Sequence, residues 1–456
     1  MDSNQSNIPE TLKHTPALGV KGYDFIIQCS PLDCTGCSSC VRVCPAKNKA
    51  LQFQPLQVVK NEQLKNYDFV KELPEVPTIF KTNTVKGIQF KQPYFEFSGA
   101  CPGCGETPYI RLLTQLFGNK MIIANATGCS SIYGGSAPSC PYSVDNQGKG
   151  PAWANSLFED NAEFGYGMYL ANKIKNNKAF GNLKSLLNLN ISLELSNAIK
   201  SLIEKENNDK NIQELINLLQ NEKNNDSNFL SLKEEIIANK DSLYKKSIWI
   251  IGGDGWAYDI GFGGIDHVIA SGANVNILVL DTEVYSNTGG QSSKSTPIGS
   301  VTKFASNGKL TNKKDLGLIA MSYKNVYVAK VAMGANQSQL INALVEAESY
   351  DGPSIIIAYA PCINHGIDMG NTQLEMKKAV QSGYWDLYRY NPTKEQPLSI
   401  DSLDPTISYL DFLKGENRYA NLLCRNPELA QELFTKSEKA AKTRRETLKQ
   451  MILKQE

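Results

Sequence analysis

The sequence predicts an α/β protein built on a parallel sheet, with a small cysteine-rich piece at its N-terminal end. Two observations lead to this prediction. Apolar runs of strand length, such as residues 248–251 and 275–280, alternate with helical patterns, and eleven cysteines fall into spaced groups. The chain has 456 residues, a formal net charge of +1 and 41% hydrophobic residues, so it can form two or more domains around a large core.

Charge and hydropathy exclude several classes of partner. A near-neutral chain is not built for nucleic acid or an anionic membrane surface. No apolar run approaches the ~18 residues of a membrane-spanning helix, and the leader, residues 1–24, lacks the basic and apolar regions of a secretory signal. We therefore expect a cytoplasmic protein. Disulfides do not persist in that reducing compartment, so grouped cysteines point to metal or iron–sulfur ligation.

The first cysteine group lies in residues 25–84, which we interpret as a partial ferredoxin-like domain followed by a proline-punctuated connector. Its spacing is C-x₂-C-x₂-C-x₃-C-P, which in two-cluster ferredoxins places three thiolates on one [4Fe–4S] cube and the fourth on a neighbouring cube. Zinc is the alternative, but a zinc site does not require the proline. The group consists of Cys34, Cys37, Cys40 and Cys44.

A second cysteine group is spread over residues 85–400. Cys101 and Cys104 precede a helix predicted over 107–117, and Cys129 and Cys362 follow strands predicted over 121–126 and 354–359. Because the carboxyl ends of parallel strands meet at one edge of a sheet, these thiols can converge there. The spacing alone is a weak signal, since single cysteines are usually core residues.

The stretch 247–291 is the centre of the predicted domain. It reads as a strand, a glycine turn with Asp254, a helix through Ile269, a second strand and a polar turn with Thr282. Such a unit crosses over right-handed, so both turns face one crevice. A carboxylate, a hydroxyl and turn carbonyls suit Mg²⁺ beside a diphosphate, and the glycines admit it. If GDG stood by itself, an ordinary glycine turn between a strand and a helix, with no bound ligand, would explain it.

Together with DTEVYSNTGGQ, the stretch GDGWAYDIG resembles the thiamine diphosphate motif of the pyruvate:ferredoxin (flavodoxin) oxidoreductase family. CPGCGETPY, TGCSSIYGG and YAPCINHG resemble the family segments that bind the cluster nearest the thiamine. The resemblance implies a parallel-sheet thiamine diphosphate-binding domain over 85–400. It implies Mg²⁺ on Asp254, Thr282 and the Val284 carbonyl, and a proximal 4Fe-4S cluster on Cys101, Cys104, Cys129 and Cys362.

For thiamine diphosphate itself the resemblance implies a larger set, in which Asn287 also reaches the substrate as the catalytic residue. That set is Glu106, Cys129, Gly253, Asp254, Gly255, Trp256, Thr282, Glu283, Val284, Tyr285, Ser286 and Asn287.

The implied function is oxidative decarboxylation of pyruvate to acetyl-CoA and CO₂ in anaerobic metabolism. Thiamine diphosphate supplies the electron sink, and clusters pass the electrons to ferredoxin or flavodoxin. One alternative is an enzyme for another 2-oxo acid, such as 2-oxoglutarate or indolepyruvate. A second is a non-catalytic electron-transfer fragment that keeps cubes without a working thiamine site.

The resemblance covers only about the last third of the single-chain enzymes. The parts that would activate the coenzyme, hold the substrate carboxylate and bind coenzyme A lie outside it. We therefore expect the lone chain to bind little and to turn over nothing, because it lacks the groups that hold the substrate and activate the coenzyme. It would be a gene fragment or would work with an upstream partner chain, in an assembled enzyme expected to be a homodimer.

The sequence departs from the family in having one CxxCxxCxxxCP motif instead of two. Another polypeptide completes the clusters, or Cys44 closes a single cube, or the chain is a fragment. Cys29 could fill the gap, but we predict a small buried thiol there. Cys140 and Cys424 match no ligand position and are interpreted as structural.

The remaining features carry no predicted chemistry. His14, His267 and His365 are interpreted as hydrogen-bonded structural residues, although a charged imidazole beyond Cys362 could tune a cube. Residues 173–246 are predicted to be a polar, solvated helical insertion, and residues 401–456 a helical tail packed on the domain or on a partner. Asn161 and Glu163 lie near the crevice without an assigned role.

Overall fold

The computed structural model describes residues 1–74, 80–135, 140–204 and 209–453. In these residues one eight-stranded sheet has the order β10-β9-β7-β8-β6-β5-β3-β4. The strands β3 to β8 run parallel, whereas β9 pairs antiparallel with β7 and β10 antiparallel with β9. Their bounds are β3 Met121–Ala126, β4 Ala152–Ser156, β5 Ser247–Gly253, β6 Asn276–Asp281, β7 Tyr327–Val331, β8 Ser354–Tyr359, β9 Tyr388–Tyr390 and β10 Leu398–Ile400.

The central strands carry the long apolar runs that the sequence shows. β6 and β8 are buried along their whole length, as expected for parallel strands covered by helices on both faces. The predicted α/β fold with a parallel sheet is confirmed, and the predicted strands match β3, β5, β6 and β8 closely. The sequence did not indicate β4, a half-buried edge strand, or the three-residue strands β9 and β10.

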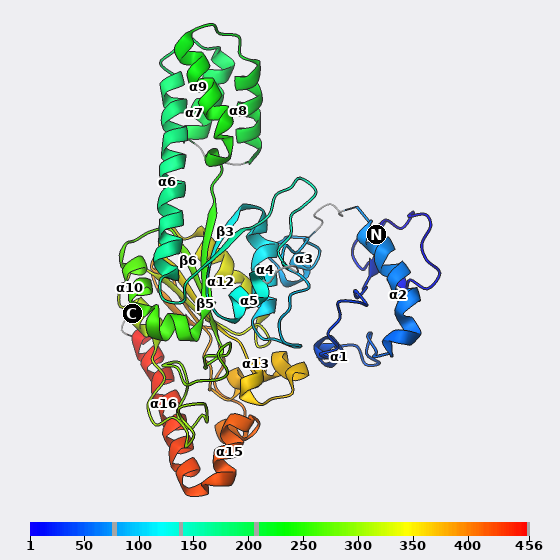
Figure 1. The fold of residues 1–456 in the computed structure, drawn as a ribbon, viewed down its shortest axis with the longest axis vertical. Helices are drawn as coiled ribbons and strands as arrows, with labels where there is room; N and C mark the ends of the chain where they lie inside the picture. Colours follow the sequence, from blue (N-terminus) through cyan, green and yellow to red (C-terminus); the bar gives the residue numbers. More distant parts are fainter. Residues whose placement is uncertain (75–79, 136–139, 205–208, 454–456) are drawn as a thin grey trace.

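Helices cover the sheet on both faces (Figure 1). α6 packs on β3 and β5, and α12 packs on β7 and β8. The helix predicted after Asp254 begins as a π-helical segment, η3, and continues as α10. The bounds are α3 Val85–Ile88, α4 Thr107–Phe117, η1 Gly118–Lys120, α5 Cys129–Gly135, α6 Asn161–Leu186, η3 Gly255–Ile260, α10 Phe262–Ala270, α11 Leu316–Met321, α12 Gln337–Ser349, η4 Ile363–His365, η5 Met369–Asn371 and α13 Thr372–Gln381.

The predicted helical insertion projects from the sheet domain at the top of Figure 1. It contains the end of α6 and the helices α7 Leu193–Glu204, α8 Asp209–Asn221, α9 Ser227–Ala238 and η2 Lys240–Leu243. It is not merely a solvated element, because its helices share a hydrophobic cluster separate from the main core. Phe229 and Leu215 lie fully buried in that cluster.

The N-terminal piece is a short hairpin followed by two helices. β1 (His14–Pro16) pairs antiparallel with β2 (Asp24–Ile26), so the pairing crosses the boundary placed after residue 24. The connector predicted in the second part of residues 25–84 contains a 16-residue helix, α2 (Leu56–Lys71). The other helix, α1 (Ser39–Val43), contacts η5 and α13 of the sheet domain.

The C-terminal tail forms part of the main core. It comprises α14 (Tyr409–Lys414), α15 (Asn417–Arg425) and α16 (Pro427–Leu453). Buried side chains of all three helices belong to the same hydrophobic cluster as the sheet, so the tail packs on its own domain. None of the helices in the described part of the chain has the length and apolarity needed to cross a membrane.

Replacing Phe229 with alanine tests whether the insertion has a core of its own. The substitution leaves a cavity in its cluster, and we expect a loss of about 3–5 kcal/mol in the stability of that unit. Amide hydrogen exchange should accelerate in α7, α8 and α9 and stay unchanged in β5 and β6. The neighbouring Leu230 is exposed, so Leu230→Ala is the matched control with little effect. Equal acceleration in the sheet would show a single shared core.

Candidate functional site

The two turns predicted to face one crevice do meet. β5 and β6 pair in parallel with Gly253 opposite Leu280, so the residues after each strand lie side by side. The hydroxyl oxygen Oγ1 of Thr282 lies 2.9 Å from Oδ1 of Asp254 and 3.0 Å from the Val284 carbonyl oxygen. Three oxygens of the types that Mg²⁺ prefers are therefore gathered at the sheet edge.

The Asp254 carboxylate is buried, and its charge is only partly compensated. Burial raises the pKa of Asp254 well above its usual range, the nearby charge of Asp281 raises it further, and hydrogen bonds from Ser293 and Thr282 act in the opposite direction. Ser293 Oγ lies 2.6 Å from Oδ2 of Asp254. A divalent cation at this position would supply the missing positive charge, so the residues present fit a magnesium site.

Buried charged side chains hold the turn from Thr282 to Val284 in place. Glu283 lies between them, and its carboxylate accepts hydrogen bonds from Lys313 and Arg418, at 2.9 and 2.8 Å. Burial alone would raise the pKa of Glu283, but these two cations outweigh it and hold that pKa at about 2. The Glu283 side chain is therefore an ionised anchor of the turn.

Three further residues of the predicted thiamine diphosphate set are buried or closely packed: Glu106, Gly255 and Trp256. Glu106 is buried and accepts a hydrogen bond of 2.9 Å from the Tyr133 hydroxyl. Burial raises the pKa of Glu106 to about 7, and the Tyr133 hydrogen bond limits the rise. Gly255 has no room for a side chain, because a Cβ would lie 2.5 Å from the Tyr285 ring. Buried Trp256 Nε1 has no hydrogen-bond partner in the described residues.

The four cysteines of the second group lie around Glu106. Burial raises the pKa of Cys129 above its ordinary value, and Glu106, Cys362, Cys104 and Cys101 each raise it further through their negative charge. The Cys104 thiol also accepts the backbone N–H of Glu106 at 3.4 Å. The thiols thus lie within electrostatic range of one another, at the sheet edge where α4 and α5 begin.

This thiol group is connected to the Asp254 turn. Ser286 contributes a side-chain hydrogen bond to Cys362, and its hydroxyl lies 2.5 Å from Thr282 Oγ1. His365, three residues after Cys362, is buried and its Nε2 lies 2.7 Å from the Thr282 carbonyl oxygen. His365 is therefore hydrogen-bonded, as the sequence analysis predicted.

Among the described residues, no three His, Cys, Asp or Glu side chains converge on a point as a single metal ion requires. A [4Fe–4S] cube makes a different demand, because each of its four thiolates binds a different iron atom. A magnesium ion held by one carboxylate, one hydroxyl and one carbonyl also differs from such a group. The donor atoms therefore fit these two groups by type.

The first cysteine group is only partly gathered. All its thiols are free, and Cys44 accepts the N–H of Ala50 at 3.3 Å. The prediction of a buried Cys29 is wrong, because this residue is exposed, three residues after the end of β2. Partial burial and then the Cys34 and Cys40 thiols raise the pKa of Cys29 to about 11, which places Cys29 beside these two.

A single backbone segment separates the two cysteine groups. A Cβ on Gly370 would lie 2.6 Å from the Cys37 carbonyl oxygen, and a Cβ on Gly103 would lie 2.3 Å from the Met369 carbonyl oxygen. Arg42 and Asp368 form an ion pair of 2.7 Å beside this contact. The segment 369–370 thus touches the Cys101–Cys104 turn on one side and the N-terminal piece on the other.

The other predicted residues are less closely tied to the site. Asn287 is exposed on the polar turn, whereas Tyr285 is half-buried against Phe158. Cys140 and Cys424 are exposed. Asn161 is buried and donates to the Ala124 carbonyl of β3 at 3.2 Å, which gives it a structural role.

No pattern in the sequence marks Ser293 or Arg418. A serine 39 residues after Asp254, or an arginine in a tail helix, has no local pattern that marks it as a neighbour of the turn.

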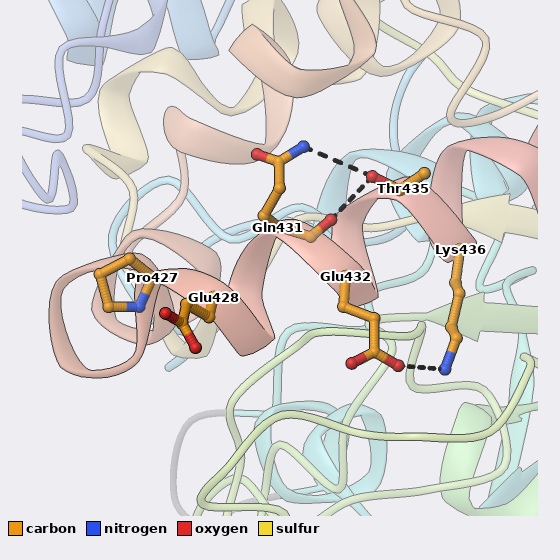
Figure 2. Close-up of a pocket in the computed structure, with 6 residues that line it drawn as sticks. All are labelled: Pro427, Glu428, Gln431, Glu432, Thr435 and Lys436. Atoms are coloured by element: carbon orange, nitrogen blue, oxygen red, sulfur yellow. Dashed lines mark hydrogen bonds and ion pairs between the residues drawn. The ribbon is translucent and has the colours of Figure 1, made fainter.

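A surface pocket along the start of α16 lies away from this chemistry (Figure 2). Its exposed side chains pair with one another, Gln431 with Thr435 and Glu432 with Lys436. None of its residues belongs to the predicted site.

Comparisons with known proteins agree with the resemblance seen in the sequence. Residues 237–358 match the family described as thiamine pyrophosphate enzyme, C-terminal TPP binding domain. Pyruvate:ferredoxin oxidoreductase of Moorella thermoacetica is 58% identical over 97% of this chain and 39% of its own length. Pyruvate-flavodoxin oxidoreductase of Klebsiella pneumoniae is 52% identical over 96% and 38%.

A third relative carries a different name. Pyruvate dehydrogenase [NADP(+)] of Cryptosporidium parvum is 46% identical over 93% of this chain and 24% of its own length. The chain thus spans about two fifths, or less, of the length of these curated relatives. Nearly all of it is related to one portion of them.

Replacing Gly105 with alanine tests the close approach that brings Cys104 and Glu106 to the Cys362 loop. The new Cβ would lie 2.5 Å from the Pro361 carbonyl oxygen, and this backbone atom has little freedom to move. We expect a loss of about 1–3 kcal/mol in the free energy of unfolding, measured by urea denaturation. Gly99→Ala is the control, because nothing lies within 4 Å of its Cβ position. Unchanged stability of Gly105→Ala would show that the two segments are not in contact.

Proposed function

We propose that this chain, related over nearly its whole length to one portion of the pyruvate:ferredoxin and pyruvate-flavodoxin oxidoreductases, is the thiamine diphosphate-binding part of such an enzyme. The observation that carries the proposal is the buried Asp254 carboxylate, with the Thr282 hydroxyl and Val284 carbonyl beside it and four thiols at the same sheet edge. The reaction would be oxidative decarboxylation of pyruvate to acetyl-CoA and CO₂.

Asp254, Thr282 and the Val284 carbonyl would hold Mg²⁺, which would in turn bind the diphosphate. When bound, thiamine diphosphate supplies an electron sink for the carbon that loses CO₂. The glycine at 253 leaves room for the coenzyme beside the backbone, and the exposed Asn287 is available to the substrate. Glu106, with a pKa of about 7, can hold or release a proton at this edge.

Electrons would leave one at a time through a 4Fe-4S cluster on Cys101, Cys104, Cys129 and Cys362. A second cluster would involve Cys34, Cys37 and Cys40, with Cys44 or Cys29 as further thiols. The contact of segment 369–370 with both cysteine groups supports transfer between them. Ferredoxin or flavodoxin would be the final acceptor, as the names of the relatives indicate.

The whole reaction needs more than this chain holds. The relatives are more than twice as long, and the groups that bind pyruvate and coenzyme A would come from the portion that this chain does not match. We propose that it works with a separate upstream chain, in an enzyme assembled as a dimer. The ranges 25–84, 85–400 and 401–456 would be its ferredoxin-like, thiamine-binding and tail regions.

The first test is coenzyme binding, which needs only this chain. Thiamine diphosphate with Mg²⁺ should raise the thermal midpoint, because a ligand at 100 times its Kd adds about 2.7 kcal/mol of stability. Asp254→Asn should abolish the rise, since it removes the carboxylate charge that attracts the cation. The matched control is Asp266 on the following helix, which accepts a hydrogen bond from the Tyr323 hydroxyl. Asp266→Asn should show the same rise as the wild type. A full response of Asp254→Asn would contradict the assigned metal site.

The second test is pyruvate-dependent reduction of a viologen dye. The purified chain should show no turnover alone and should gain it when the upstream chain of a relative is added. Cys129→Ser should lower the reconstituted rate by at least tenfold, because it removes a cluster thiolate. Cys140→Ser, an exposed thiol near the same helix, should not change it. Full activity of the lone chain would overturn the proposed division of labour.

A further inference from the structure

The polar turn that carries two proposed magnesium ligands has an unusual backbone. Glu283, between Thr282 and Val284, has a φ of 61°, in the left-handed region that non-glycine residues rarely adopt. In this conformation the Thr282 hydroxyl and the Val284 carbonyl point to the same place, 3.0 Å apart. The arrangement of the oxygens therefore depends on keeping Glu283 in a strained conformation.

Three distant segments hold the Glu283 side chain. Lys313, before α11, lies 2.9 Å from Oε1, while Arg418 of α15 and the Tyr384 hydroxyl lie 2.8 and 2.5 Å from Oε2. Glu283 and Arg418 are both almost completely buried. Water does not replace these contacts, so the surrounding segments fix the carboxylate.

The same C-terminal segment reaches the other side of the turn. Arg418 Nε lies 2.6 Å from Glu416 Oε2, and Glu416 Oε1 lies 3.6 Å from His365 Nδ1. The opposite ring nitrogen of His365 lies 2.7 Å from the Thr282 carbonyl oxygen. Residues 416 and 418 thus contact both Glu283 and, through His365, Thr282.

We propose that Arg418 is a positioning residue for the metal-binding turn, acting through Glu283. The inference rests on the proposed magnesium and thiamine diphosphate site, to which it adds a residue in the tail. Arg418 touches none of the three proposed magnesium ligands directly. It holds the carboxylate whose own backbone sets the direction of the Thr282 hydroxyl and the Val284 carbonyl.

Another buried arginine of the tail allows a matched comparison. Arg445 of α16 pairs with Asp386 at 2.7 Å and is also buried, but it contacts Asp386, Asp404 and Ser402 instead of the turn. A purely structural role would make substitutions of Arg418 and Arg445 equivalent. A positioning role makes only Arg418 affect metal binding.

The experiment titrates Mg²⁺ into the full chain at saturating thiamine diphosphate and follows binding by calorimetry, with the thermal midpoint recorded separately. Arg418→Met should weaken the apparent Mg²⁺ affinity by about tenfold or more, the usual effect of losing a group that orients a metal ligand. Arg445→Met should lower the midpoint and leave the affinity unchanged. Arg418→Lys keeps the positive charge but loses the paired donors of the planar guanidinium. Its Mg²⁺ affinity should lie between those of the wild type and Arg418→Met.

A double variant separates positioning from general damage. Glycine adopts a φ near 61° without strain, so Glu283→Gly removes the need for a side-chain anchor. In that background Arg418→Met should cause no further loss of Mg²⁺ affinity. If Arg418→Met does not fold, Arg418→Lys and the double variant provide the same comparison.

The outcomes distinguish the two proposals. Wild-type Mg²⁺ affinity in Arg418→Met or Arg418→Lys, or an equal loss in Arg445→Met, would overturn the positioning role and leave the proposed function intact. An undiminished effect of Arg418→Met in the Glu283→Gly background would also overturn it. A wild-type chain that binds no thiamine diphosphate with Mg²⁺ would overturn the proposed function, and the positioning role with it.

Discussion

The parallel pairing of β5 with β6 is the constraint on which the rest of the site depends. It sets Asp254 and Thr282 at the same level of one sheet edge, 2.9 Å apart and shielded from water. Burying a carboxylate is costly unless it is paired, and Asp281 lies close enough to raise that cost. Two hydroxyls, of Ser293 and Thr282, donate hydrogen bonds to Asp254 and offset part of this cost. Lys313 adds a positive charge that contacts both Asp281 and Glu283.

The C-terminal helices complete this charge balance. Arg418 brings the second cation to Glu283, and it is itself balanced by Glu416. The tail is therefore an integral part of the domain, because removing this arginine would take a cation away from two buried carboxylates, Glu283 and Glu416. The same reasoning explains why the tail helices share the main core instead of an independent cluster like that of the insertion.

Much of the fold could be predicted from the sequence because it is encoded locally. Apolar runs located β5, β6 and β8, and the spacing between two glycine-rich turns placed Asp254 opposite Thr282. The edge strand β4 was missed because its half-buried sequence lacks such a run. Ser293, Glu416 and Arg418 were missed because their role arises from contacts between distant segments, which no short pattern records. Cys29 was misjudged because the burial of one thiol depends on how the N-terminal hairpin packs.

Glycine at two positions explains how closely the cysteine groups approach one another. At Gly103 and at Gly370 a single added carbon would collide with backbone atoms, of Met369 in one case and of Cys37 in the other. The backbone of residues 369–370 therefore lies directly between the turn that carries Cys101 and Cys104 and the segment that carries Cys37. Since electron transfer weakens steeply with distance, a side chain at either glycine would separate the groups as well as strain the contact. The same absence of a Cβ thus serves packing and the proposed route for electrons.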